Sequence, residues 1–298
     1  IDIFDFNDAA TFNFKENAVI IDAVFGTGLN RRTNKKEVDL ITFLNGVKLP
    51  KVSIDMPSGL LAGQMITDQT VIFKADETLS FQFWKKTFLH PETGIYCGKV
   101  HILDISLSEE FIQDEITSDY VIDDQLIHRI YKTRSEFSHK GNFGKTTIIA
   151  GSFGRVGAAV LAVKAALKTG SGLTFVHAPK CGYEILQTSC PEAIYLYGGE
   201  NHHDRFHIDH DTVVGIGPSL GINTDTESAF MDFLKSCDQP MVLDADALNI
   251  ISRHSQFLAR IPENSIITPH PKEFERLFGI TENSFDRVEL AREKAAEL

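Results

Sequence analysis

Short runs of apolar and β-branched residues recur along the chain, and each run ends at a cluster of Gly, Pro, Asp or Ser. Unbroken apolar runs of this length are typical of strands buried on both faces of a parallel sheet. The polar clusters therefore fall at the carboxyl ends of strands, where open parallel sheets bind their ligands. The expected strands are Val19–Val24, Val52–Ile54, Thr146–Ala150, Val213–Ile216, Met241–Leu243 and Ile266–Ile267.

Apolar residues at helical spacing lie between these runs. They predict a helix over Val156–Lys168, and further helices over Ser228–Leu234 and after Glu273. Strands that alternate with helices indicate an α/β fold with a doubly wound parallel sheet.

An acidic and polar stretch from about Ser106 to Phe137 divides the chain. The 298 residues, 43% of them hydrophobic, suffice for two domains with their own cores. We place the boundary near Ser118, which gives domains of residues 1–117 and 118–298.

Composition narrows the class of protein further. The formal net charge is −12, whereas a nucleic-acid partner requires a basic face, so none is expected. No apolar run reaches the length of a membrane span and no signal-type leader is visible, so no membrane association is expected either. Four cysteines without a Cys-x-x-Cys spacing indicate a reducing compartment, and we expect a cytoplasmic protein.

The strand Thr146–Ala150 runs into Gly151-Ser152-Phe153-Gly154, and Gly157-Ala158-Ala159 then opens a helix. Backbone N–H groups of such a turn and the helix dipole favour a bound anion. An ordinary turn between a strand and a helix is the alternative.

Two carboxylates in the first half of the chain lie near the ends of predicted strands. Asp22 stands four residues before Gly26-Thr27-Gly28, whose glycines would let the backbone approach a phosphate. Asp55 opens Asp55-Met-Pro-Ser-Gly59, in which the proline and glycine hold Asp55 and Ser58 rigidly. An aspartate so placed can move protons or hold a cation, or it can simply cap a helix or turn.

Two clusters in the second half carry similar alternatives. Asp244 and Asp246 could bind Mg²⁺ on a turn, or cap the end of a strand. His270 is fixed between two prolines, and we interpret it as a donor to a substrate rather than as an exposed loop histidine.

Two further stretches are interpreted as structural. His202, His203, His207 and His210 could form a metal site, but their polar surroundings favour a solvated loop. The aromatic run Phe81-Gln-Phe83-Trp84 predicts a strand packed on a core.

Taken together, the motifs have the order of one known family. Those of the first half are Asp22-Ala-Val-Phe-Gly-Thr-Gly-Leu29 and Ile54-Asp-Met-Pro-Ser-Gly-Leu60. Those of the second half are His139-Lys-Gly141, Gly151-Ser152 with Gly157-Ala158-Ala159, Gly215-Ile-Gly-Pro-Ser-Leu-Gly221, Leu243-Asp-Ala-Asp-Ala-Leu-Asn249 and Thr268-Pro-His-Pro-Lys-Glu-Phe274. The chain resembles the bifunctional NAD(P)H-hydrate repair enzymes, the YjeF or Nnr family.

The resemblance implies a Rossmann-like epimerase portion followed by a ribokinase-like, doubly wound dehydratase domain. The implied activities are the epimerisation of R and S NAD(P)H-hydrate and the ADP-dependent dehydration of the S form to NAD(P)H. They imply K⁺ and Mg²⁺ as metal ions, ADP as a co-substrate and a homo-oligomeric assembly.

The resemblance also assigns residues. It makes Asp55 catalytic, in contact with the reacting ring, and gives Asp22 and Ser58 the potassium ion. It places Ala158, Ser219 and His270 in the hydrate pocket of the dehydratase. The residues implied to cradle the hydrate's phosphates in the epimerase are Gly26, Thr27, Gly28, Leu29, Asn30, Arg31 and Arg32.

The chain departs from the family pattern in three places. Ser219 stands where the family has glycine, which is tolerable if its φ is negative. The Asn-Asn-Gly-Gly-Asp loop of the epimerase and the Gly-Thr-Gly-Asp motif of the dehydratase are absent, and we expect them before Ile1 and after Leu298. Since that last Asp is the implied general base, the 298 residues alone are expected to lack dehydratase activity.

Two other functions remain open. A ribokinase-like small-molecule kinase would share the fold and the glycine turns, but would not account for the motifs around Asp22 and Asp55. A non-catalytic nucleotide-binding module would keep the fold without its chemistry.

Overall fold

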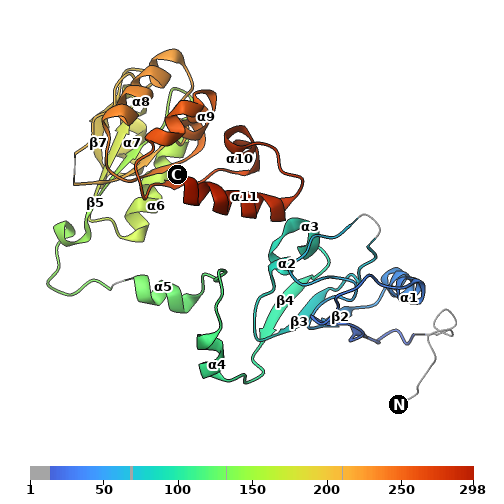
Figure 1. Cartoon of the computed structure of the whole chain (residues 1–298). Coiled ribbons are helices and arrows are strands. Elements are labelled where there is room, and N and C mark those ends of the chain that lie inside the picture. Colours follow the sequence, from blue (N-terminus) through green and yellow to red (C-terminus); the bar gives the residue numbers. More distant parts are fainter. Residues whose placement is uncertain (1–13, 68–69, 132, 210) are drawn as a thin grey trace. The chain divides into compact units, whose positions relative to one another are not determined.

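Two parallel sheets organise the chain (Figure 1). The computed structural model describes residues 14–67, 70–131, 133–209 and 211–298. They divide into an N-terminal unit, reaching Tyr131 and including Glu282–Leu290, and a C-terminal unit of Lys132–Thr281 with Ala291–Leu298. The predicted α/β class with parallel sheets is confirmed, and the predicted domain boundary near Ser118 stays a prediction.

The sheet of the N-terminal unit has the strand order β1-β2-β3-β4, and every neighbouring pair is parallel. The first two strands were predicted, whereas β3 and β4 were not. The strands are β1 (Ile20–Asp22), β2 (Lys51–Ile54), β3 (Glu77–Phe81) and β4 (Lys99–Leu103). The helices of this unit are α1 (Lys35–Gly46), α2 (Lys86–Leu89) and α3 (Pro91–Gly94).

The acidic stretch after β4 holds two short helices, α4 (Glu109–Asp114) and α5 (Asp124–Ile130). Each begins at a side-chain cap, from Ser108 and Asp123 respectively. Part of the acidic composition therefore serves to start these helices.

The sheet of the C-terminal unit has the order β10-β9-β8-β5-β6-β7, again with parallel neighbours. Four of its strands were predicted, and β6 and β7 extend the sheet on one side. The strands are β5 (Lys145–Ile149), β6 (Leu173–Ala178), β7 (Ile194–Tyr197), β8 (Val213–Ile216), β9 (Met241–Leu243) and β10 (Ile266–Ile267). The helices are α6 (Gly157–Thr169), α7 (Tyr183–Ser189), α8 (Thr224–Ser236), α9 (Ala245–Arg253) and α10 (Pro271–Phe278), with short 3₁₀ helices at Lys140–Phe143, Lys180–Gly182 and Ser255–Arg260. Residues of α11 (Ser284–Glu297) belong to both units.

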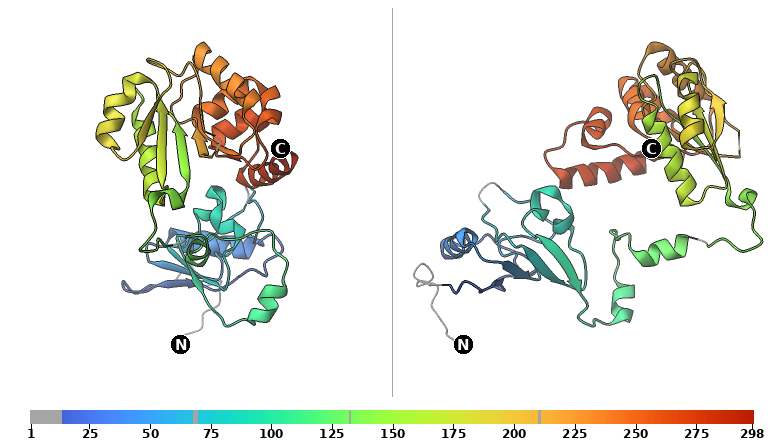
Figure 2. Two further views of the ribbon diagram at one scale, coloured as in Figure 1. Left: turned by 90° about the vertical axis from the view of Figure 1, so that its left-hand side faces the viewer. Right: turned by 180° about the vertical axis from the view of Figure 1, so that it is seen from behind.

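Helices cover both faces of this second sheet (Figure 2). Consecutive residues of a strand point to opposite faces, so Ile148 joins the core under α6 and α7 while Ile149 joins the core under α8 and α9. This is the burial on both faces that the unbroken apolar runs predicted.

Two structural interpretations were wrong. Phe81 ends β3, but Phe83 and Trp84 lie beyond the strand and are 49% and 41% exposed, so the aromatic run does not pack on a core. His203 is fully buried, so the histidine-rich segment is not simply a solvated loop. His210 lies outside the described residues. Within the described chain, no helix combines the length and apolar character needed to cross a membrane.

Candidate functional sites at the carboxyl ends of the two sheets

Asp22 and Ser58 meet at the carboxyl end of the first sheet. Asp22 ends β1 and is 2% exposed, and Ser58 follows β2. The Ser58 hydroxyl donates to Oδ1 of Asp22 at 2.5 Å and the Ser58 N–H to Oδ2 at 2.7 Å. The Ser53 hydroxyl also donates to Oδ2, at 3.2 Å. The parallel pairing of β1 with β2 therefore brings together two residues that are 36 positions apart.

The surroundings of Asp22 fit a cation that prefers oxygen ligands. All of its hydrogen-bond donors are neutral, and in the described part of the chain no Lys, Arg or His lies within ion-pair distance of its carboxylate. A buried carboxylate without a counter-charge is costly. Its oxygens and the Ser58 hydroxyl are hard ligands of the kind that alkali and alkaline-earth cations prefer.

Asp55 lies directly after β2 in a strained backbone conformation. Its φ is +67°, which is uncommon for a residue with a side chain and is typical of functional sites. The Thr27 N–H donates to Oδ2 of Asp55 at 2.9 Å, so the glycine turn after β1 is held against this carboxylate. A Cβ at Gly26 would lie 2.8 Å from the same oxygen, so any other residue there would displace the Asp55 carboxylate.

Sequence reasoning missed Lys85, which lies four residues after β3. Its ammonium group contacts Oδ1 of Asp55 at 2.9 Å, with the two side chains 13% and 11% exposed. Burial alone would raise the pKa of the Asp55 carboxyl, but the Thr27 N–H, the Lys85 ammonium and the Phe81 N–H together lower it below its ordinary value. Asp55 is therefore an ionised carboxylate near neutral pH. A lysine just past a strand end was the available signal for this pairing.

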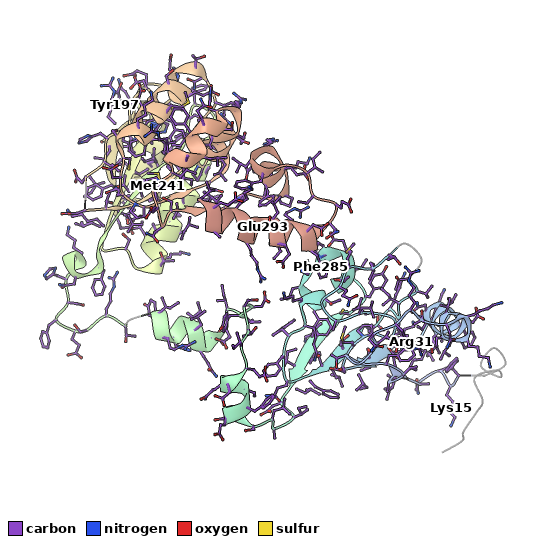
Figure 3. All side chains as sticks on the ribbon, in the orientation of Figure 1. Lys15, Arg31, Tyr197, Met241, Phe285 and Glu293 are labelled. Atoms are coloured by element: carbon purple, nitrogen blue, oxygen red, sulfur yellow. The ribbon has the colours of Figure 1, made fainter. Side chains whose placement is uncertain are left out.

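The residues predicted to cradle the phosphates, Gly26 to Arg32, differ in whether they already have a partner within the protein. Arg31, on the loop before α1 (Figure 3), donates twice to Glu37, at 2.7 and 2.9 Å. Glu37 also completes the capping box of α1 with Asn34, so Arg31 is committed to starting that helix. Gly28 has open space around it, and Arg32 lines a pocket of about 170 Å³ beside Gly59 and Thr70.

In the C-terminal unit, the turns after β5 and β8 are hydrogen-bonded to each other. The Gly151 N–H donates to the Pro218 carbonyl at 2.9 Å, and the Ser152 hydroxyl donates to the Ser219 carbonyl at 2.9 Å. Ala158 is half-buried in the first turn of α6, which in the described chain has no side-chain cap. Without a cap from Val156, the first N–H groups of α6 are available to an anion.

The condition for a serine at position 219, a negative φ, is not met. Its φ is +52°, in the left-handed region that glycine adopts without cost. The neighbouring Gly217 and Gly221 also have positive φ, so the loop keeps the glycine conformation with a serine at its centre.

Replacing Ser219 with glycine is expected to stabilise the C-terminal unit. Removing the Cβ at positive φ gains more than the extra freedom of the unfolded chain costs, and we expect a net gain of about 0.5–1 kcal/mol. Thermal unfolding should shift upward by a few degrees (about 1–4 °C). Ser219→Ala keeps the Cβ and should give no gain, whereas a lower melting temperature for Ser219→Gly would contradict the strain.

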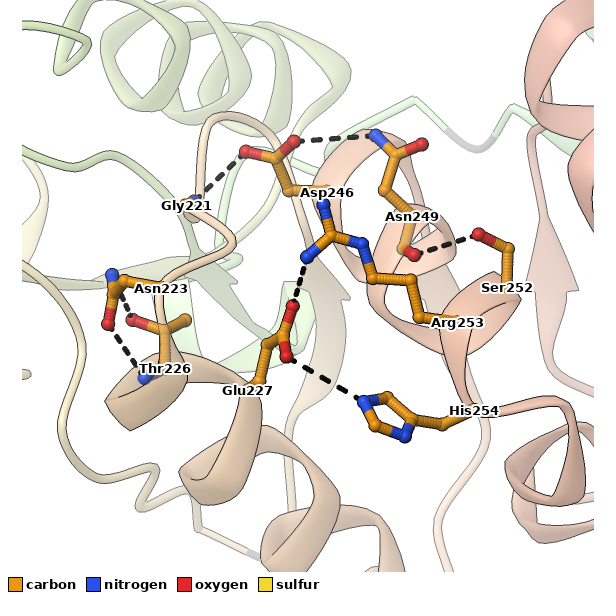
Figure 4. Close-up of polar contacts among 9 residues, drawn as sticks. All are labelled: Gly221, Asn223, Thr226, Glu227, Asp246, Asn249, Ser252, Arg253 and His254. Atoms are coloured by element: carbon orange, nitrogen blue, oxygen red, sulfur yellow. Dashed lines mark hydrogen bonds and ion pairs between the residues drawn. The ribbon is translucent and has the colours of Figure 1, made fainter.

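Asp246 clamps the loop that carries Ser219 (Figure 4). Its Oδ2 accepts the Gly221 N–H at 2.9 Å, and its own N–H donates to the Gly217 carbonyl at 3.3 Å. The Arg155 guanidinium lies 3.7 Å from the same Oδ2, and Asn249 approaches Oδ1 at 3.4 Å.

These contacts do not fit Asp244 and Asp246 as a pair of Mg²⁺ ligands. Asp246 already faces an arginine and a backbone donor, and Asp244 accepts the Thr268 hydroxyl at 2.8 Å. Among the described residues, no three His, Cys, Asp or Glu side chains are grouped as metal ligands. The two aspartates therefore organise the ends of β8, β9 and β10, which is the capping alternative.

His270 caps α10. Its Nδ1 accepts the Lys272 N–H at 3.2 Å, which places the ring proton on Nε2, 3.2 Å from Oε1 of the buried Glu273. The ring is 56% exposed, so Nε2–H would have to turn from Glu273 to donate to a ligand. Arg276 of the same helix donates to Asn249 of α9 at 2.6 Å, which joins α10 to the helix that carries Asp246.

His203 lies against the turn that contains Gly151. Its Nε2 donates to the Gly151 carbonyl at 3.1 Å, and its own carbonyl accepts the Thr226 hydroxyl at the start of α8. His177 of β6 stacks on it with ring centroids 5.4 Å apart, and among residues 14–67, 70–131, 133–209 and 211–298 neither buried nitrogen of His177 has a partner. Burial lowers the pKa of His177 to about 4 and that of His203 to about 3.

The chain matches known families over both units. Residues 146–298 match the model described as NAD(P)H-hydrate dehydratase, and residues 2–87 match the model described as YjeF-related protein N-terminus. The bifunctional NAD(P)H-hydrate repair enzyme Nnr of Vibrio cholerae is 33% identical over 261 residues, which are 88% of this chain and 52% of that protein. The chain spans about half the length of the curated relatives it matches.

The chain is also similar to solved structures, of which the first shares its fold. A ribokinase-like superfamily protein from Enterococcus faecalis is 24% identical with a TM-score of 0.50, over 59% of this chain and 62% of that one. An ADP/ATP-dependent NAD(P)H-hydrate dehydratase from Bacillus subtilis, co-crystallized with ATP/Mg²⁺, is 30% identical with a TM-score of 0.45, over 56% of this chain and 59% of that one.

The fold and the two strand-end clusters define a two-unit α/β protein with a ribokinase-like C-terminal unit. The chain belongs to the family of bifunctional NAD(P)H-hydrate repair enzymes, as its motifs predicted.

Proposed function

We propose that the protein containing these residues repairs hydrated nicotinamide nucleotides in two steps. The N-terminal unit interconverts R and S NAD(P)H-hydrate, and the C-terminal unit dehydrates the S form with ADP. The observation that carries the first step is the hydrogen bond from Thr27 to Asp55, which sets a glycine turn for phosphates against an ionised carboxylate. Family membership over both units supports the pairing of the two activities.

An ionised Asp55 suits one route of epimerisation. Hydration of the enamine places the hydroxyl on the carbon next to the ring nitrogen. Asp55 takes the hydroxyl proton, the O–H electron pair forms a carbonyl, and the ring C–N bond breaks with its electron pair on nitrogen, which takes up that proton. Rotation beside the carbonyl exposes its other face, and reversal of the same steps closes the ring as the other epimer.

Other residues of the N-terminal unit would bind the substrate. Asp22 and Ser58 would hold K⁺, which would supply a positive charge beside the glycine turn. Gly26 to Asn30 would approach the phosphates through their backbone, and Arg32 would supply the charge. Arg31 would act indirectly, because its guanidinium is paired with Glu37.

In the C-terminal unit, Ala158, Ser219 and His270 would line the hydrate pocket. The phosphoryl group passes from ADP to the ring hydroxyl and leaves AMP, and elimination then releases phosphate and restores the ring double bond. Mg²⁺ is expected with the nucleotide rather than on Asp244 and Asp246. We also predict that the enzyme is a cytoplasmic homo-oligomer and that it binds neither membrane nor nucleic acid.

The test measures both activities on R and S NADPH-hydrate separated by chromatography. The 298-residue chain and any longer polypeptide that contains it are assayed side by side, with and without ADP. Interconversion of the epimers, and ADP-dependent recovery of NADPH absorbance in the longer form, are the expected results. If no form changes the epimer ratio or recovers NADPH, the repair function is wrong. Stabilisation by sugars or a vitamin precursor instead of the hydrate would favour a small-molecule kinase.

A further inference from the structure

The Lys85 ammonium group makes three hydrogen bonds within the protein, whereas that of an ordinary surface lysine points into water. Its ammonium group donates to Oδ1 of Asp55 at 2.9 Å, to the Ser80 hydroxyl at 2.6 Å and to the Phe81 carbonyl at 2.8 Å. An ammonium group has three protons, so all of them are used. Lys85 therefore has no N–H left to direct at a substrate while these contacts persist.

The fold brings Lys85 to Asp55 through neighbouring strands. The Asp55 N–H donates to the Leu79 carbonyl of β3 at 2.8 Å, so the end of β2 is fixed to β3. Lys85 immediately precedes α2 and reaches back over the end of β3. In the described residues, Lys85 is the only charged side chain that changes the pKa of Asp55, and the remaining contacts come from the Thr27 and Phe81 N–H groups.

We propose that Lys85 is a positioning residue for Asp55: it fixes the carboxylate through Oδ1 and keeps it ionised as the base of epimerisation. The inference rests on the proposed epimerase function. Thr27 holds the other oxygen, so the carboxylate is restrained from both sides. A base held in this way needs no reorganisation when it takes the proton from the substrate.

The first test needs no activity. The ¹³C carboxyl resonance of Asp55, assigned by its loss in Asp55→Asn, is followed with pH in the 298-residue chain. Lys85→Met should raise the titration midpoint of Asp55, and Lys85→Arg should leave it low, because loss of the cation favours the neutral acid. Lys86→Met is the matched control, since Lys86 pairs with Asp119 rather than with Asp55. If Lys85→Met does not fold, Lys85→Gln replaces it. An unchanged midpoint in the folded neutral variant would overturn the inference.

The second test follows epimerisation in a polypeptide that shows it. Neutralising Lys85 should lower kcat by about 10–100-fold with little change in KM, because the base is misplaced while the binding turn remains. The acid limb of kcat/KM should move to higher pH, since Asp55 is then protonated at a pH where it was ionised. Lys85→Arg should restore most of the rate.

The two tests separate the inference from the function. A raised midpoint together with a chain that never epimerises the hydrate, in any length, refutes the proposed function and leaves the ion pair as a structural feature. Active epimerisation that Lys85→Met leaves unchanged in rate and pH profile refutes the positioning role alone.

Discussion

Replacing Asp55 with asparagine is expected to lower the epimerisation rate by about 10²–10⁴-fold, the contribution typical of a positioned general base. Asparagine keeps the shape of the side chain and an oxygen that can accept from Thr27 or Lys85. It has no basic group that can take the hydroxyl proton. Hydrate binding should therefore survive, and the loss should fall on kcat rather than on KM.

The controls for this prediction lie in the same unit. Asp39→Asn, on the exposed side of α1, makes the same chemical change away from the site and should keep the rate. Because Asp55→Asn leaves Lys85 without its carboxylate, the thermal unfolding of each variant is measured as well. A folded Asp55→Asn enzyme with kcat within about threefold of the original would show that another group is the base.

The apolar runs predicted the buried middle of each sheet correctly, because strands covered on both faces need uninterrupted apolar side chains. They did not predict β3, in which Thr78 and Ser80 are both fully buried. The Thr78 hydroxyl donates to the Cys97 carbonyl, and the Ser80 hydroxyl accepts from Lys85. Hydrogen bonds satisfy these polar groups, and such partners cannot be read from local sequence.

The candidate site shows a similar division. Asp22, Ser58 and Asp55 could be placed from the sequence because each lies near the end of a predicted strand and close to Gly or Pro. Lys85 was missed, because its role depends on a contact with Asp55 at the end of a neighbouring strand. The φ of Ser219 was also beyond local reasoning, since the loop is held from outside by Asp246 and by the turn after β5.

The pair His177 and His203 is expected to make the C-terminal unit sensitive to acid. The ordinary pKa of histidine is about 6.5, and burial lowers the pKa of His177 to about 4 and that of His203 to about 3. Below pH 6.5 the unfolded chain therefore binds protons that the folded unit does not, so stability is full above that pH and falls as pH decreases through the folded values. At pH 4 the loss for one such histidine is roughly 3 kcal/mol, a large part of the stability of many domains.

Urea unfolding of the chain at pH 7, 5.5 and 4.5 measures this loss. His177→Phe replaces a ring whose nitrogens have no partner with one of similar shape, so stability at pH 7 should change little and the loss at acid pH should be about halved. His202→Phe is the matched control, because His202 is 40% exposed on the same segment and should leave the acid loss unchanged. If His177→Phe loses stability at acid pH as steeply as the original chain does, the carboxylates and not this histidine pair cause the acid sensitivity.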